Sequence, residues 1–289
     1  MRKLIVLGAA ATLYLPVAAS AQAPAAAPAA PAAPVCPPSG YTAPVYGTFG
    51  TNDGFNTAYE IAGPCNPRIL RDAAQAIGMG RNVPLGVKNV STIRFSAEGT
   101  LAPLASAKIA VHISYVVPGI RMTIEGTGSK NLKVAETRVF ADGKVWNEKQ
   151  PGVDMSPALA ETAAERAAII KLTPFGALWS VIEAEGHAKV ATVAGKTVVS
   201  GASPYDGMRV TVTFDDQKRP EKVEVAAGKH RYQATFSDYG NKWEPDYLVI
   251  FPAKIVWTKD GKPFADLKVT EFKSNPYVVF PGPESTGPQ

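Results

Sequence analysis

The residue types that most often carry catalysis are few in this chain and widely spaced. The three histidines, His112, His187 and His230, lie far apart in the sequence. None belongs to a His-x-His or His-Glu-x-x-His pattern, the spacings that place two ligands on one metal ion. We therefore expect a structural or surface role for each histidine and predict no metal site.

Three short motifs resemble catalytic or phosphate-binding signatures, but each lacks an essential feature. The GASPY sequence at 201–205 misses the final glycine of a nucleophile elbow. The GKT sequence at 195–197 imitates the end of a phosphate-binding loop, yet Val190 occupies the first glycine position and no helix is expected to follow. Asp215 and Asp216 stand in a polar string typical of a turn between strands. The sequence thus predicts a protein that is not an enzyme and uses no cofactor.

Two helical segments are expected to support the rest of the fold. Pro67 in a first turn, followed by regularly spaced apolar residues, predicts a helix at 67–79. A helical insert is predicted at 156–185; it opens at the Ser-Pro pair 156–157 and restarts at the Thr-Pro pair 173–174. Each half of the insert has one apolar face and must therefore pack against another element.

Short alternating segments fill most of the chain between Ser91 and Phe280 and predict strands. In 93–98, for example, apolar and polar residues point to opposite sides with a period of two. Asp-Gly pairs at 142–143 and 260–261 predict hairpin turns. An antiparallel sheet with this many strands curls. The predicted fold is mainly β (α+β), a curved antiparallel sheet or half-barrel with the helical insert covering its concave face.

This arrangement resembles the half-barrel of the periplasmic lipoprotein carrier and outer-membrane lipoprotein receptor families. The resemblance covers about residues 67–281 and rests on strand order and helix placement, without a short diagnostic motif. It implies a noncatalytic protein that holds an acyl chain against the concave side of its sheet.

Several local sequences are also similar to the strand-rich region that precedes the catalytic domain of some bacterial metallo-β-lactamase-fold hydrolases. These sequences are LTPFG at 172–176, RP at 219–220, Tyr232, FSDY at 236–239, FPAKI at 251–255 and LKVT at 267–270. The hydrolase domain has no counterpart here, so this second resemblance implies only the noncatalytic module.

Nine residues are candidates for lining the interior between sheet and helices. All are aromatic or methionine and lie on predicted strands or on the apolar face of the insert: Phe95, Tyr115, Met122, Phe175, Trp179, Phe214, Tyr232, Phe236 and Trp257. The sequence leaves two interpretations open. These side chains either fill a core, as any half-barrel requires, or line a cavity for an apolar ligand.

The N-terminal part of the chain predicts export. Residues 1–21 combine a basic start, an apolar stretch and small residues before a cleavage point, which is typical of a signal peptide. An Ala/Pro-rich linker follows at 22–40, and 41–289 is predicted to form a single β-rich domain. We expect a periplasmic location, no transmembrane segment after signal removal, and a disulfide between Cys36 and Cys65 in that oxidising compartment.

Charge excludes one class of partner. The formal net charge is +5 and falls to +3 without Arg2 and Lys3. The remaining charges are spread along the chain, whereas a nucleic-acid-binding surface has clustered Lys and Arg with interleaved aromatics. We expect no nucleic-acid partner.

Two functions remain, and a third class, an enzyme of unfamiliar design, would need a buried polar cluster of which the sequence gives no sign. The first is a carrier that binds a hydrophobic ligand, either a small lipid or the acyl chain of a lipidated protein, without catalysis. The alternative is a noncatalytic interaction module or accessory subunit of an exported enzyme or envelope complex. Such a module would have a filled core and would bind its partner, an envelope protein, through its outer face.

Overall fold

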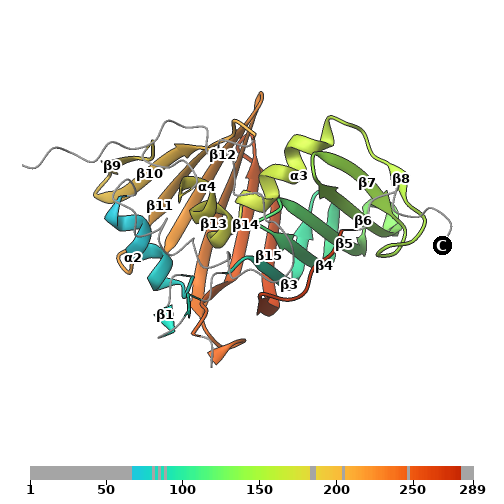
Figure 1. Ribbon diagram of the computed structural model, residues 1–289. Coiled ribbons are helices and arrows are strands. Elements are labelled where there is room, and N and C mark those ends of the chain that lie inside the picture. Colours follow the sequence, from blue (N-terminus) through green and yellow to red (C-terminus); the bar gives the residue numbers. More distant parts are fainter. Residues whose placement is uncertain are drawn as a thin grey trace, which may run out of the picture. The chain divides into compact units, whose positions relative to one another are not determined.

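The computed structural model describes residues 67–79, 82–83, 86–87, 90–182, 187–203, 206–245 and 248–280, all within one compact unit. The predicted signal peptide, linker and cysteine pair lie outside these residues. The predicted fold class is confirmed: the protein is mainly β, and a curved antiparallel sheet of 13 strands, not closed into a barrel, has helices on its concave side (Figure 1).

The strands of the large sheet lie in an order that differs from their order in the chain. From one edge to the other they are β8 (Ser156–Pro157), β7 (Lys144–Glu148), β6 (Lys133–Ala141), β5 (Gly119–Thr127), β4 (Leu104–Ser114), β3 (Thr92–Leu101), β15 (Lys262–Ser274), β14 (Phe251–Lys259), β13 (His230–Gly240), β12 (Pro220–Ala227), β11 (Arg209–Phe214), β10 (Lys196–Ala202) and β9 (Lys189–Val193). A separate pair, β1 (Asn82–Val83) and β2 (Gly86–Val87), forms a small second sheet, and a short 3-10 turn, η2 (Ser129–Asn131), links β5 to β6.

The sheet consists of two meanders that meet at its centre. One runs outward from β3 to the edge at β8, and the other returns from the opposite edge at β9 to β15. At the centre, β3 and β15 pair directly, with Phe95 opposite Phe272. The segment from 158 to 188 must therefore connect the two edges, which would lie about 58 Å apart in a flat sheet with 4.8 Å between strands. Curvature shortens that path, and the connection crosses the concave face as α3 and α4 (Figure 1).

The helical insert is confirmed, but its predicted start is wrong. Helix α3 spans Thr162–Lys171 and α4 spans Pro174–Ile182, whereas Ser156–Pro157 forms the edge strand β8 against Trp146 and Asn147 of β7. Proline is tolerated on an edge strand because an outward-facing position there needs no N–H donor. Pairing with the free edge of β7 thus replaces the helical start that the Ser-Pro sequence suggested.

The first helix, α2 (Arg68–Ala76), begins as predicted and ends a few residues earlier. Gly78 has a φ of +78°, and the N–H groups of Gly78 and Met79 donate to the carbonyls of Gln75 and Ala74. These two bonds form the Schellman termination that left-handed glycine permits. A Cβ at Gly78 would lie 2.4 Å from the carbonyl oxygen of Leu248, so the position also requires the absence of a side chain.

The predicted turns are confirmed. Asp142-Gly143 and Asp260-Gly261 both have positive φ values, as tight hairpins require, and so does Ala194-Gly195, which places the GKT sequence in the β9–β10 hairpin. Asp215 closes the β11–β12 turn, because its Oδ1 accepts hydrogen bonds from the backbone N–H groups of Gln217 (2.9 Å) and Arg219 (2.8 Å). The Asp-Asp pair is therefore part of a turn.

Candidate functional site

The structure brings all nine candidate interior residues together. Every one is buried, and all belong to one continuous apolar core between the concave face and the helices. Next to them, Phe251 and Phe272 stack with ring centroids 4.2 Å apart, and Phe175 of α4 stacks on both at 6.1 Å. Helix α4 is thus joined by aromatic packing to the two central strands β14 and β15.

Several polar groups of the core side chains are paired. Trp179 Nε1 donates to the carbonyl oxygen of Val90 (2.9 Å), and Trp257 Nε1 donates to that of Leu172 (3.3 Å). The hydroxyls of Tyr115 and Thr173 are 2.9 Å apart, and burial raises the pKa of Tyr115. All nine residues of α4 are buried. The interior is therefore apolar, well packed in this conformation, and suited to apolar groups.

Helix α3 is attached to the rest of the protein at both ends by charged side chains. Near its start, Glu165 Oε2 lies 2.5 Å from Lys259 Nζ on β14. At its end, Lys171 Nζ lies 3.0 Å from Asp206. The bond to Glu165 raises the pKa of Lys259, whose ammonium also lies 5.4 Å from the ring centroid of the interior residue Tyr232. We call these two ion pairs the α3 anchors.

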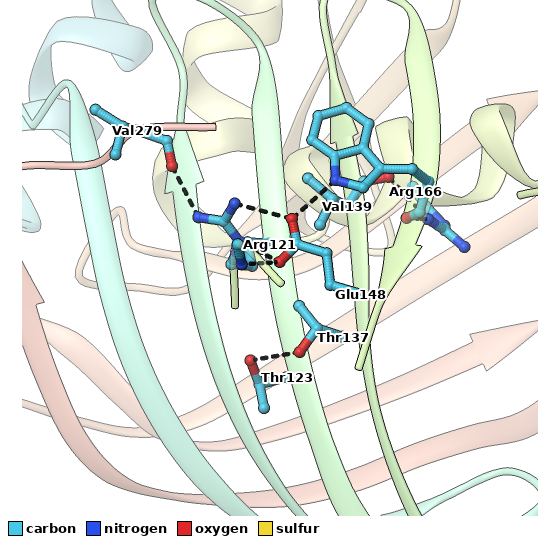
Figure 2. Close-up of polar contacts among 9 residues, drawn as sticks. Arg121, Thr123, Thr137, Val139, Glu148, Arg166 and Val279 are labelled. Atoms are coloured by element: carbon cyan, nitrogen blue, oxygen red, sulfur yellow. Dashed lines mark hydrogen bonds and ion pairs between the residues drawn. The ribbon is translucent and has the colours of Figure 1, made fainter. Parts of the chain in front are cut away.

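A third attachment of α3 is buried. Arg166 donates hydrogen bonds to the carbonyl oxygens of Val139 (2.7 Å) and Trp146 (2.6 Å) and to the side-chain oxygen of Asn147 (2.6 Å). Burial lowers the pKa of this guanidinium to about 10, so it stays charged at neutral pH. Figure 2 shows Arg166 beside Val139 on the edge half of the sheet.

A second polar network lies nearby and holds a fully buried carboxylate (Figure 2). Glu148 accepts hydrogen bonds from Arg121 Nε (3.1 Å) and Nη2 (3.1 Å), from Trp146 Nε1 (2.8 Å) and from the backbone N–H of Gly152 (2.7 Å). Its side chain is 0% exposed. Four donors occupy the acceptor positions of this carboxylate, so its role is to hold β5, β7 and the following loop together.

The C-terminal segment 275–280, which we call the strap, completes this network on the outer face of the sheet. Thr92 Oγ1 donates to the carbonyl oxygen of Pro276 (2.7 Å), and Arg121 Nη1 donates to that of Val279 (2.8 Å). The Arg121 guanidinium also lies 5.8 Å from the centroid of the Phe280 ring. That ring packs against Gly119, where a Cβ would approach it to 2.6 Å.

Sequence reasoning did not single out Arg121, Glu148 or Arg166. Each occupies a position in a local pattern that is also typical of a solvated side chain. The partners that bury them come from other elements: β5 with β7, α3 with β6 and β7, and the strap with β5. The sequence does show that each of these charged residues lies in a segment rich in apolar residues. That observation does not identify the residue with which each one pairs.

Two grooves lie on the outer face of the described part of the sheet. One, of about 630 Å³, crosses β3 to β6 and is lined by side chains that include Glu98, Lys108, Glu125 and Lys133. The other, of about 300 Å³, crosses β11 to β14; its lining includes Arg209, Thr211, Glu224, Arg231 and Gln233. Both grooves include charged side chains in their lining.

The residues considered for catalysis stay apart. Within the described ranges, no group of three or more His, Cys, Asp or Glu residues is placed to hold a metal ion. His112 lies on β4, where burial and the charges of Arg94 and Arg121 lower its pKa. Ser203 is buried, and its Oγ has no hydrogen-bond partner in the described structure. No base is therefore seen to activate this serine.

Comparison with known proteins gives no family assignment, because no protein-family model and no curated protein matches the sequence significantly. Among the described residues, no helix combines the length and apolar character needed to cross a membrane.

Proposed function

We propose that this protein is a noncatalytic carrier that takes up a hydrophobic ligand, a lipid or lipoprotein acyl chain, between its curved sheet and the α3–α4 pair. One observation carries this proposal. The nine interior residues belong to an apolar core that is covered on one side by short helices instead of by a second sheet. We further propose that it acts in the periplasm after removal of residues 1–21, with Cys36 and Cys65 joined.

Uptake requires the helices to move, because the interior is filled by the protein's own side chains. Of the two α3 anchors, the pair of Glu165 and Lys259 suits such a movement. A partly exposed ion pair contributes about 0–1 kcal/mol, so water replaces it at little cost. The side chains of Glu165 and Lys259 are 22% and 33% exposed. Opening at α3 leaves α4 in contact with β10, β11 and α2.

A second function is favoured by a different observation. Helix α4 is buried on every side, and both interior tryptophans have their N–H groups bonded. A core completed in this way needs no ligand. It would suit an interaction module that binds an envelope protein through its outer face.

Native mass spectrometry, combined with organic extraction, separates the two functions. The protein should be purified from a periplasmic extract without detergent. A carrier retains a lipid-sized mass that extraction removes and that an added fatty acid restores. A clean protein mass that does not change when fatty acid is added would refute the carrier and leave the interaction module.

The α3 anchors provide a sharper test. Glu165→Gln removes the charge that holds Lys259, so we expect a fluorescent fatty acid to bind several-fold faster, measured by stopped-flow fluorescence. Stability should fall by less than about 1 kcal/mol, because the pair is partly exposed. Lys218→Met is the matched control, since Lys218 makes a similar ion pair (2.6 Å) with Asp72 on α2, away from α3. Equal rates in the parent and in both variants would contradict uptake at α3.

A further inference from the structure

The smaller outer groove contains two arginines that lack a partner. Arg209 of β11 and Arg231 of β13 are both exposed, and neither guanidinium has an ion pair or hydrogen bond with any residue that the structure describes. Four other positive side chains of the sheet, Arg94, Arg121, Lys254 and Lys259, each pair with a carboxylate. The groove thus presents positive charge that the protein itself does not neutralise.

Strand register places these two arginines on the same face of the sheet, on either side of one residue. Both Arg209 and Arg231 lie directly opposite Ala226 of β12, one on each side. Neighbouring strands are about 4.8 Å apart, so the two backbones are separated by about 10 Å. Ala226 is exposed and has only a methyl group. Two long guanidinium side chains can therefore converge above it without obstruction.

The remaining groove residues fit an anion with several oxygens. Thr211, Gln233 and Thr258 line the same groove and offer hydroxyl and amide donors. One carboxylate is present, Glu224, but Lys222 Nζ lies 2.5 Å from its Oε1 and offsets its charge.

From these observations we infer that the groove over Ala226 binds a phosphate group, held between Arg209 and Arg231. Guanidinium groups bind phosphate oxygens bidentately, and a tetrahedral phosphate presents oxygens to two guanidinium groups at once. A volume of about 300 Å³ suits a phosphate monoester or the headgroup of a phospholipid. This site lies on the outer face and does not depend on a ligand in the interior.

The first test uses inorganic phosphate in a phosphate-free buffer, with binding measured by calorimetry. Arg209→Gln and Arg231→Gln should each weaken binding by about tenfold, since each removes a charge-assisted hydrogen-bonding group. The double variant should show no measurable binding. Glu224→Gln should strengthen binding, because it removes the one negative charge in the groove. Arg68→Gln, which changes an exposed arginine on α2, is the control and should bind like the parent.

Vesicles distinguish the two sources of the phosphate. Vesicles of phosphatidylcholine with phosphatidylglycerol are compared with phosphatidylcholine alone in a flotation assay. Binding only to the mixed vesicles, and only with both arginines present, assigns an anionic lipid headgroup. Phosphate binding without vesicle binding assigns a soluble phosphate. Failure of the parent to bind phosphate, or equal binding by the double variant, overturns the inference. Circular dichroism checks that the variants remain folded, as expected because neither arginine side chain makes a described polar contact.

Discussion

The buried carboxylate of Glu148 connects several parts of the sheet through its hydrogen bonds. Four donors satisfy it, two from Arg121, one from Trp146 and one from Gly152, and water does not reach it. A buried ion pair contributes little net stability compared with an apolar replacement of both partners, but loss of one partner leaves an uncompensated charge. The guanidinium of Arg121 also supports the strap through Val279.

We therefore expect Glu148→Gln to lower the free energy of unfolding by about 3 kcal/mol, measured by urea denaturation. The control is Glu98→Gln on β3, because Glu98 is also ion-paired on a strand but is 55% exposed, with Lys108 at 3.1 Å. Its loss should stay below about 1 kcal/mol. Equal losses in the two variants would show that Glu148 is not a structural anchor.

His112 makes stability depend on pH. Burial, followed by the charges of Arg94 and Arg121, lowers its pKa below the ordinary 6.5. Between the two pKa values the unfolded chain binds more protons than the folded protein, so stability falls as pH drops through 6.5. In His112→Gln this contribution is absent. We expect the variant to lose less stability than the parent when pH is lowered from about 8 to about 5, measured by denaturation at each pH. Parallel stability curves would contradict this.

At the scale of the element, the strap is held by a small number of contacts and should be separable from the sheet. Gly119→Ala places a methyl group where the Phe280 ring lies, and this ring is the end of a side chain that can rotate away. We expect the ring to leave Arg121, with a stability loss of about 1 kcal/mol. Limited proteolysis should then cut within 275–280 sooner than in the parent, while the strands remain protected. An unchanged cleavage rate would mean that Phe280 does not hold the strap.

Local elements were the most predictable part of the chain. Alternation identified the strands, and the Asp-Gly pairs identified hairpins, because both signals reside within a few residues. The predicted start of the insert at Ser156 was wrong because that segment pairs with the edge of strand β7 instead. Propensity describes what a segment prefers alone, and tertiary pairing overrode it there.

For the whole molecule, the curved sheet and its covered concave face were predictable from the number of alternating segments. The nine interior residues, from Phe95 to Trp257, were identified from the sequence because the apolar faces of strands and helices must pack against one another. The pairing of Arg121 with Glu148, and the placement of Arg209 and Arg231 on either side of Ala226, were not predictable. They depend on which strands become neighbours, and a sequence pattern with a period of two contains no information on strand order.

The central pairing of β3 with β15 has a consequence for how the protein folds. Each meander consists of hairpins between consecutive strands, which close over short stretches of chain. The seam between the meanders is different: Arg94 and Glu271, bonded across it, are 177 residues apart in the sequence. Closing so long a loop is slow because its entropic cost comes before any contact is gained. We expect the two meanders to form early and their union at β3 and β15 to limit the folding rate.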